Sequence, residues 1–336
     1  MTTINASRRR LVATAALVGG LAAATLTACG QEVAAGQTEA QVGFPVEVSD
    51  CGRQIAVAGS PQRVVAMSPS QTEAIIRLGL TDRLVGQAQT ASHELPEDIR
   101  GEAAGVPVLA ADSPPSREVL LAANPDFVFA PSSFEFSAES GFASIDQVTA
   151  AGATAYIAAG GCSDRRAEGS VDDIFTDIDT LGTIFDVPDA ARAVADDARA
   201  RLDAVARDVE GKPTPTVAQL YVEATSISAI AGGVEADVVR QAGGESVYNG
   251  EEPIFAQSPW ATVSSEDIVA RQPEAIVFAV TSEENEKEVR AILQERLGQT
   301  PAVREGNLIA VPAPDLSPGA FGNITAVETV ARQLHR

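Results

Sequence analysis

The sequence predicts an α/β protein of two similar lobes, and three observations support this prediction. Short apolar segments of strand character alternate with amphipathic segments of helical character over most of the chain. Such alternation is typical of α/β layers with parallel sheets. It is interrupted once, near the middle of the chain, by two helical segments without a flexible linker. A helix–proline–strand unit occurs on each side of that interruption, which indicates that the two halves are related.

The first half begins with a predicted hairpin, because residues 46–48 and 54–57 alternate in polarity around Asp50-Cys51-Gly52. The next run, 63–67, is apolar as in a strand buried on both faces. The strands are expected at 63–67, 84–86, 127–130 and 155–157, and the helices at 72–80, 119–123 and 145–150. Together these segments form the predicted N-terminal lobe, residues 44–169.

Two helical segments form the interruption at mid-chain. Ser170 and Asp173 make a start that resembles a capping box, and apolar residues follow at i, i+3, i+4 spacing up to Phe185. Pro188 interrupts the pattern, and a second helix is expected over 189–209. Any connection that these helices make between lobes is therefore stiff. We assign 170–187 to the helix between the lobes and 188–336 to the C-terminal lobe.

The second half repeats the pattern of the first. Its strands are expected at 217–222, 275–279 and 308–311, and its helices at 238–241, 268–271 and 289–297. Residues 116–130 resemble residues 264–278, since each segment is a short helix, a proline stop and a strand. Glu118 and Glu266 each lie seven residues before the proline. Helix–proline–strand units are common in α/β proteins, but the shared glutamate raises this match above a chance one.

The N-terminus has the layout of an export signal. Arg8, Arg9 and Arg10 precede an uncharged stretch that is short for a membrane span, which needs ~20 residues. The stretch ends in Leu26-Thr27-Ala28-Cys29, which resembles a bacterial lipobox, where a lipid is attached to the cysteine. We therefore expect 1–28 to be a lipoprotein signal peptide and Cys29 to be lipidated. An uncleaved anchor helix and a plain secretory signal are the alternatives, and a partial twin-arginine pattern leaves the export route open.

The charge of the mature chain limits its partners. Residues 29–43 are small and mostly polar, so we expect a flexible tether there. Residues 1–28 contain three of the 24 Lys and Arg and none of the 46 Asp and Glu, which leaves a formal charge of −25. Such a chain is repelled by nucleic acid and by anionic lipid heads. No nucleic-acid partner is expected, and the membrane is expected to be reached through the lipid alone.

Two cysteines remain once Cys29 is assigned to lipidation. Cys51 and Cys162 are an even pair in a chain expected outside the cytosol, where disulfides persist. A bridge between them would close a loop of about 110 residues, which stabilises by about 4–5 kcal/mol in the chain-entropy model. We expect this disulfide, with two buried free thiols as the alternative.

Several short motifs occur in a characteristic order along the chain. They are Arg63-Val64-Val65-Ala66-Met67-Ser68-Pro69 with Thr72-Glu73, Leu78-Gly79-Leu80, Glu118 with Asn124-Pro125-Asp126-Phe127-Val128, Gly243-Gly244, Trp260 and Val263-Ser264-Ser265-Glu266. In this order they resemble the substrate-binding proteins of ABC importers for iron–siderophore complexes and vitamin B12, over residues 46–334. The resemblance implies two Rossmann-like lobes with parallel-rich central sheets, joined by a rigid long helix, with the ligand between the lobes and only small lobe closure.

The resemblance also implies partners and a location. In that family one glutamate on each lobe docks onto arginines of the membrane permease, and position in the repeated unit makes these Glu118 and Glu266. The implied partners are a permease dimer with its ATPase subunits, and the receptor is expected to be a monomer on the outer face of the cytoplasmic membrane. Exposed glutamates at helix starts, favoured by the helix dipole, are the alternative explanation.

The loops at the carboxyl ends of the strands should hold the ligand. We place them at 67–72, 88–97, 131–143, 222–237, 249–264, 280–286 and 312–324. These loops contain several acidic residues and no Lys or Arg. Anionic chelates would require arginine forks, so a neutral or cationic metal chelate is expected. A ferric hydroxamate siderophore is favoured, with a corrinoid or haem as alternatives, and no cofactor of the protein itself is expected.

Candidate ligand contacts are polar and aromatic side chains in these loops or directly beside them. Aromatic walls hold bulky ligands at modest entropic cost, although any one of these aromatic residues is equally compatible with core packing. His93 is a lone histidine, for which a position at the surface or rim is the simpler interpretation. The candidates are Ser68, Thr90, His93, Phe134, Phe136, Tyr221, Glu223, Trp260, Asp315 and Phe321.

Other classes of function have weaker support. An importer of bare zinc or manganese usually has several histidines, whereas this chain has only His93 and His335. Nucleophile-elbow, zincin, P-loop and dinucleotide motifs are absent from the sequence, so we expect a protein that is not an enzyme. A lipoprotein of this fold that senses a ligand without transporting it stays an alternative.

Overall fold

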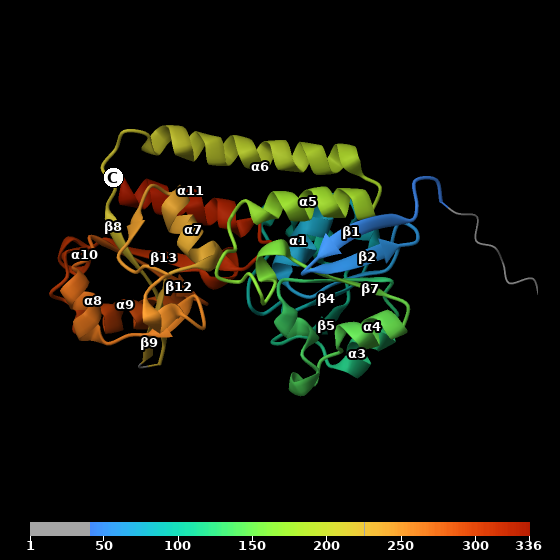
Figure 1. The fold of residues 1–336 in the computed structure, drawn as a ribbon, viewed down its shortest axis with the longest axis horizontal. Coiled ribbons are helices and arrows are strands. Elements are labelled where there is room, and N and C mark those ends of the chain that lie inside the picture. The colour runs from blue at the N-terminus through green and yellow to red at the C-terminus, as the bar shows by residue number, and fades with distance from the viewer. Residues whose placement is uncertain (1–40, 225) are drawn as a thin grey trace, which may run out of the picture. The chain divides into compact units, whose positions relative to one another are not determined.

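Two parallel-rich sheets, one in each lobe, organise the computed structural model, which describes residues 41–224 and 226–336 (Figure 1). The signal peptide, Cys29 and most of the tether lie outside the described residues. The five-stranded sheet of the N-lobe has the order β5-β4-β3-β6-β7 and is parallel throughout. Its strands are β3 (Val64–Ala66), β4 (Leu84–Ala88), β5 (Val108–Ala110), β6 (Phe127–Ala130) and β7 (Thr154–Ile157).

The strands of the N-lobe are apolar on both faces because a separate core packs on each face. In β6, Phe127 and Phe129 enter one hydrophobic cluster, whereas Val128 and Ala130 enter another. This explains why the run reads as continuously apolar. The lobe's helices are α1 (Pro69–Arg77), α2 (Glu97–Ala103), α3 (Arg117–Ala122), α4 (Ile145–Ala150) and α5 (Asp173–Ile184).

The sheet of the C-lobe is mixed. Its order is β11-β9-β8-β12-β13, with the short β10 beside the start of β8. β12 is parallel to β8 and β13, while β9 is antiparallel to both β8 and β11. Its strands are β8 (Thr216–Glu223), β9 (Ser226–Ile230), β10 (Glu245–Ser246), β11 (Trp260–Thr262), β12 (Ala275–Val280) and β13 (Leu308–Pro312). Its helices are α7 (Gly233–Gln241), α8 (Ser265–Arg271), α9 (Glu283–Leu297), α10 (Pro301–Glu305) and α11 (Gly322–Leu334).

The sequence repeat corresponds to equivalent structural units. In each lobe a short helix ends at a residue of positive φ, Asn124 at 48° and Gln272 at 49°, directly before the proline. The acid after the proline then binds the start of the neighbouring strand, since Asp126 accepts from Arg63 N–H and Glu274 from Thr216 N–H, at 2.8 and 2.7 Å. The repeat therefore fixes how each helix–strand unit joins its sheet.

A hairpin and a disulfide close the N-lobe. β1 (Val46–Asp50) and β2 (Arg53–Val57) pair antiparallel, as predicted, around a turn that contains Cys51. Cys51 forms a disulfide with Cys162, and their Cα atoms lie 5.2 Å apart. The predicted pairing is confirmed, and it ties the hairpin to the segment that follows β7.

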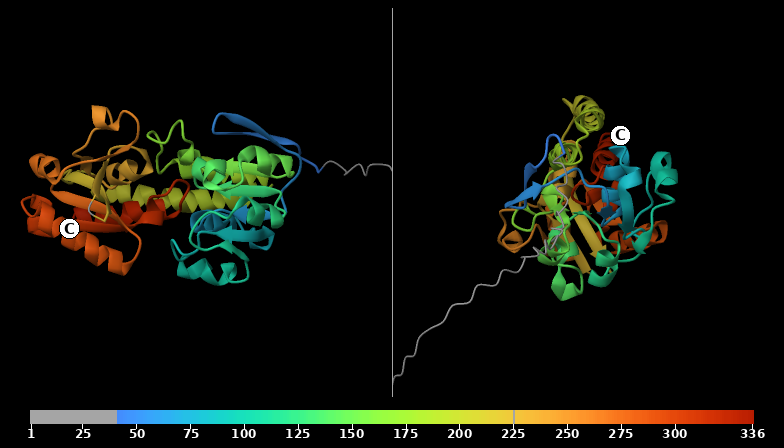
Figure 2. Two further views of the ribbon diagram at one scale, coloured as in Figure 1. Left: turned by 90° about the horizontal axis from the view of Figure 1, so that it is seen from below. Right: turned by 90° about the vertical axis from the view of Figure 1, so that its right-hand side faces the viewer.

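The long helix α6 (Pro188–Val209) runs along both lobes and packs against α5 and α11 (Figures 1 and 2). α6 packs closely on α5 where Ala191 faces Gly182, because any Cβ at Gly182 would lie only 2.5 Å from the Cβ of Ala191. Leu202 packs against core clusters of both lobes. The connection therefore lies on α6, which differs from the predicted 170–187, because the apolar face of α5 belongs to the N-lobe core.

Several elements are present that the sequence patterns did not predict. They are α2, α10, α11 and the short strands β5, β9, β10 and β11. β5 and β10 have only three and two residues, too few for a period to emerge. Residues 163–171, here called the crossing segment, leave the N-lobe after Cys162 and contact the C-lobe, where Gly233 N–H donates to Ala167 C=O at 2.8 Å.

Candidate ligand-binding site

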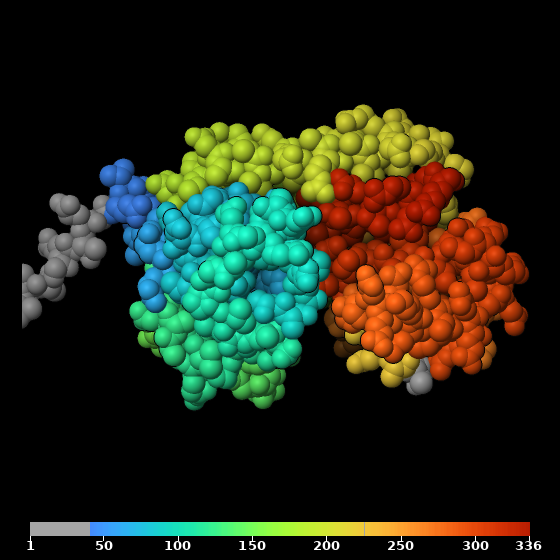
Figure 3. Space-filling view, turned by 180° about the vertical axis from the view of Figure 1, so that it is seen from behind, coloured from blue at the N-terminus to red at the C-terminus, as the bar shows by residue number. Residues whose placement is uncertain are grey.

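A pocket of about 410 Å³ lies on the C-lobe beside the crossing segment. Exposed Tyr221 and Glu223 alternate along β8 with buried Leu220 and Val222, so one face of the strand's end faces the pocket. In the space-filling view, a furrow separates the two lobes below α6 and α11 (Figure 3). The pocket is lined by Arg166, Tyr221, Glu223, Ser228, Ile230, Glu235, Trp260, Ala279, Ala313, Leu316, Ser317 and Pro318.

Trp260 is the main aromatic wall of this pocket. Its side chain is 47% exposed, although most large apolar residues of the lobe are buried. It begins β11 and pairs with Ile230 of β9, which also lines the pocket. With Tyr221, 40% exposed, it offers two aromatic surfaces to a ligand. Both residues were predicted, and the structure brings them together.

Arg166 is a pocket residue that the sequence analysis missed. It lies in the crossing segment, which follows β7 and was not among the predicted ligand loops, so the expectation of a site without Lys or Arg is wrong. Its guanidinium lies 5.5 Å from the centre of the Trp260 ring and donates to both carboxylate oxygens of Glu235. The sequence did contain a signal for a cation at this site, since a loop with two arginines follows the last strand of the N-lobe sheet.

The C-lobe makes room for Arg166 with a pair of glycines. Gly233 has φ +76°, and a Cβ there would lie 2.6 Å from Arg166 Nη1. A Cβ at Gly232 would lie 2.9 Å from Ala167 C=O. Side chains at either position would displace the crossing segment, so the Arg166–Glu235 contact depends on this local sequence.

Two predicted residues of the N-lobe, Thr90 and His93, line a separate pocket of about 340 Å³. His93 Nε2 lies 3.8 Å from Asp315 Oδ1 of the C-lobe, which makes it a contact between lobes. Burial lowers the pKa of His93, although Glu94 acts in the opposite direction. Burial raises the pKa of Asp315 to about 7, and Glu73 adds to the increase. Much of this contact is therefore uncharged at neutral pH.

The other predicted contacts differ in their placement. Phe134 is 56% exposed on its loop and packs edge-on against Phe142 at 5.5 Å, outside the described pocket. Phe136 and Phe321 are each 6% exposed and belong to hydrophobic cores, so the prediction that they contact ligand is replaced by a packing role. Ser68 precedes α1 and its hydroxyl contacts the Gln71 side chain.

Glu118 and Glu266 occupy equivalent positions in α3 and α8, in the first helical turn after a serine cap. Both are exposed. A hydrogen bond from its own backbone N–H lowers the pKa of each glutamate, and Arg117 lowers that of Glu118 further. Glu118 accepts from Arg117 at 2.6 Å. Both carboxylates are thus charged and accessible, one on each lobe.

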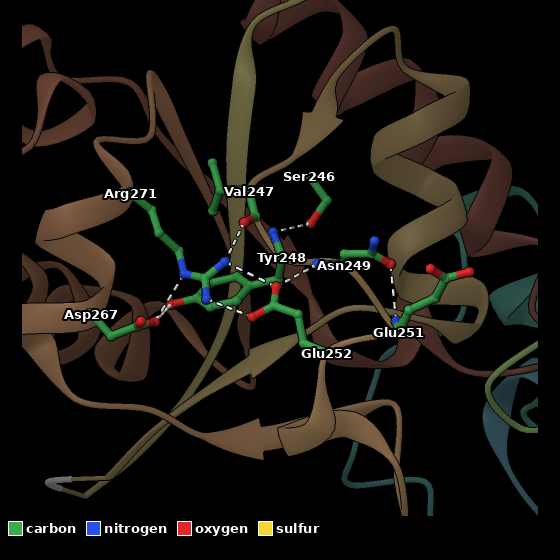
Figure 4. Close-up of polar contacts among 8 residues, drawn as sticks. All are labelled: Ser246, Val247, Tyr248, Asn249, Glu251, Glu252, Asp267 and Arg271. Carbon is green, nitrogen blue, oxygen red and sulfur yellow. Dashed lines mark hydrogen bonds and ion pairs between the residues drawn. The ribbon is translucent and has the colours of Figure 1, made fainter.

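An arginine-centred cluster fixes the loop next to α8 (Figure 4). Arg271 donates to both oxygens of Glu252, to Asp267 and to Val247 C=O, at 2.7–3.0 Å. Its guanidinium lies 4.1 Å from the centre of the Tyr248 ring, and Tyr248 donates to Asp267 at 2.9 Å. Segment 247–252, which leads toward Trp260, is therefore tied to the helix that carries Glu266.

Two further properties concern the part of the chain that the structure describes. In 41–224 and 226–336 no helix is both long and apolar enough to cross a membrane. The one group of possible metal ligands found there, Asp50, Cys51 and Cys162, contains the two disulfide-bonded cysteines, so those sulfurs are not free to bind an ion.

Two α/β lobes braced by one long helix, with a polar and aromatic pocket beside the segment that crosses between them, define a solute-binding protein. The chain belongs to the periplasmic binding protein family, whose model matches residues 64–314. It is thus a substrate-binding protein of the ABC importer type, a family that works outside the cytoplasm.

Relatives and solved structures agree with this membership. The chain is 28% identical to a vitamin B12-binding protein of Yersinia pestis, over 67% of this chain and 71% of the relative. It is 23% identical to a cobalamin-binding protein of Halobacterium salinarum, over 87% and 74% of the two chains. A structure described as an ABC-type Fe3+-hydroxamate transport system, from Saccharomonospora viridis, has a TM-score of 0.71 at 20% identity, covering 87% of this chain and all of that one. The last likeness establishes the predicted two-lobed fold.

Proposed function

We propose that this protein is a lipid-anchored extracytoplasmic receptor that captures a bulky metal chelate and delivers it to an ABC permease. The observation that carries the proposal is the pocket in which Tyr221 and Trp260 remain exposed beside polar Glu223 and Ser228. Exposed aromatic side chains in a concave site suit a large, partly apolar ligand. A ferric hydroxamate siderophore is our first candidate.

A corrinoid is the second candidate, and the relatives favour it. The proteins from Yersinia pestis and Halobacterium salinarum carry names that state B12 or cobalamin binding. A corrinoid also combines apolar edges with amide groups, which suits the same mixture of aromatic and polar walls. Haem is less favoured, because its two carboxylates would meet Glu223 and Glu235 in the pocket.

Docking and anchoring complete the proposal. Glu118 and Glu266 present one carboxylate per lobe to permease arginines, which gives orientation more than affinity. Cys29 carries the lipid, and the tether 29–43 holds the monomeric receptor near the membrane. Chelate, permease dimer and ATPase subunits are the proposed partners.

Fluorescence of Trp260 tests the ligand proposal, since it is the only tryptophan in the sequence. The soluble chain from residue 30 would be titrated with ferrioxamine B, cyanocobalamin and haem, with calorimetry as a second readout. Saturable binding of ferrioxamine B or cyanocobalamin below about 10 μM supports the proposal. Binding of none of the three would reject it. Binding by the chain, together with normal chelate uptake by cells that lack it, would instead favour a sensing lipoprotein.

A further inference from the structure

The pocket contains one arginine, Arg166, whose positive charge is compensated by a carboxylate that lines the same pocket. Among the described residues that line it, Arg166 is the only Lys or Arg. Its Nη1 donates to Glu235 Oε2 at 3.0 Å, and its Nη2 donates to Oε1 of the same carboxylate. The two side chains are only 20% and 13% exposed. The pair occupies two of the five N–H donors of the guanidinium and compensates its positive charge.

Trp260 covers the same guanidinium. The ring centre lies 5.5 Å from the Arg166 side chain, and both residues line the pocket. Arg166 therefore contacts both a carboxylate and an aromatic ring, beside Gly233, where a Cβ would lie 2.6 Å from its Nη1. The second pocket carboxylate, Glu223, forms no ion pair or side-chain hydrogen bond with any other described residue. The pocket thus combines a neutralised cation with an unneutralised acid.

We propose that Glu235 determines the charge preference of the pocket by neutralising Arg166, so that chelates bearing negative charge are rejected. This inference rests on the proposed function and names the property that selects among its ligands. Removal of the Glu235 charge would leave Arg166 free to bind a ligand carboxylate. Removal of Arg166 would add a second unpaired acid and strengthen the bias against anions.

The test uses two pairs of chelates that differ mainly in charge. Ferrioxamine B ends in an ammonium and its N-succinyl derivative in a carboxylate, while cyanocobalamin is uncharged overall and its monocarboxylic acid is anionic. For any scaffold that binds, we expect the wild type to prefer the non-anionic member at least about tenfold, equivalent to ~1.4 kcal/mol. Glu235→Gln should reduce that ratio at least about fivefold, and Arg166→Gln should increase it.

Glu223→Gln is the matched control, because it removes one negative charge from the same pocket without freeing an arginine. Its ratio should change less than that of Glu235→Gln, and the double variant Arg166→Gln/Glu235→Gln should return close to the wild-type ratio. Thermal unfolding shows whether each variant is folded. Arg166→Gln should shift the affinity ratio in the opposite direction from Glu235→Gln, so the test stays decisive if one of the two variants misfolds. Equal binding of both members by the wild type, or equal effects of Glu223→Gln and Glu235→Gln, overturns the inference. If neither scaffold binds at all, the proposed function itself fails.

Discussion

Trp260 owes its exposure to the sheet edge on which it lies. β11 is an edge strand of the C-lobe sheet and, among the described strands, pairs with β9 alone. Core packing on both faces buries the central strands, whereas the first residue of a short edge strand is free to face the pocket. Trp260 contacts Arg166 with part of its ring and leaves about half of its surface open to the pocket, so we propose that the open part contacts the ligand.

Replacement of Trp260 tests that assignment. Trp260→Ala should weaken chelate binding at least about tenfold, because it removes an aromatic wall worth ~1.4 kcal/mol or more. Its effect on unfolding should be small, since the side chain is half exposed. Because Trp260→Ala removes the fluorescent reporter, isothermal titration calorimetry would measure chelate binding by the variant and by the wild type. Phe134→Ala is the control, as it removes an exposed aromatic residue outside the described pocket; an equal loss there would assign binding to another surface.

Asp177 is a buried acid beneath the ligand loops. Its Oδ1 accepts from Tyr156 Oη at 2.7 Å and from Ala159 N–H at 2.9 Å, while Oδ2 has no hydrogen-bond partner among the residues that the structure describes. Burial raises the pKa of Asp177 to about 7, in spite of these two donors. The folded protein therefore holds a proton there between about pH 4 and pH 7 that the unfolded chain releases.

This difference makes a prediction about stability against pH. Because the pKa is raised in the folded state, the contribution of Asp177 to stability falls as pH rises through that window. Asp177→Asn cannot ionise and keeps an oxygen for Tyr156 and Ala159. The free energy of unfolding of this variant, minus that of the wild type, should increase from pH 4 to pH 8 by up to about 4 kcal/mol. Urea unfolding at both values measures it, with exposed Asp146→Asn as control; a constant difference between variant and wild type would contradict the prediction.

Single residues were predictable where their local sequence determines their environment. Cys51 and Cys162 could be paired by elimination, and Tyr221 lies in the strand predicted at 217–222, while Trp260 was found as the aromatic residue of a predicted ligand loop. Phe136 and Phe321 lie in equally plausible loops, yet their rings are buried. Arg166 was missed because its contacts with Glu235 and Trp260 are made across 69 and 94 positions of sequence. The loop with two arginines after β7 was a signal for a cation at the strand ends, but the pairing of Arg166 with Glu235 and Trp260 has no local signal.

At the scale of elements, the helix–proline–strand unit places Glu118 and Glu266 alike. The left-handed residue before each proline ends the helix and directs the strand into the sheet, which leaves the helix start exposed at its other end. The ends of α7 and α9 lie where the sequence places them, but the two helices begin five and six residues earlier than predicted, at Gly233 and Glu283. The short edge strands and α11 were not predicted, because their patterns are too brief or too mixed to show a period.

Charge reversal at these helix starts tests the docking proposal. Glu118→Lys with Glu266→Lys should reduce chelate uptake at least about tenfold in cells, because the two introduced lysines would repel the permease arginines that the glutamates attract. Binding of the chelate to the purified receptor should be unchanged. Asp146→Lys with Glu284→Lys is the control, since these exposed acids lie in the first turns of α4 and α9, one per lobe. Weakened chelate binding in the first pair would place the two glutamates at the ligand site.

The whole molecule is coupled through elements that cross between the lobes. Phe321 and Ile324, at the start of α11, enter a core cluster made mainly by the N-lobe, and Leu202 of α6 contacts clusters of both lobes. In the opposite direction, Val171 of the crossing segment enters a C-lobe cluster. Each lobe therefore completes part of its core with residues from the other side, which favours small relative motion of the lobes.

Shared cores should make the lobes unfold together. Ile178→Ala truncates a side chain of the N-lobe core that is 1% exposed, which should cost about 2–5 kcal/mol. Because Trp260 lies in the C-lobe, its fluorescence reports on the other lobe. We expect the urea midpoint seen by Trp260 to fall by the same amount as the midpoint seen by far-ultraviolet circular dichroism. A Trp260 transition that stays at the wild-type midpoint, while part of the helical signal is lost earlier, would show that the lobes unfold independently and that α6 links them without coupling their stability.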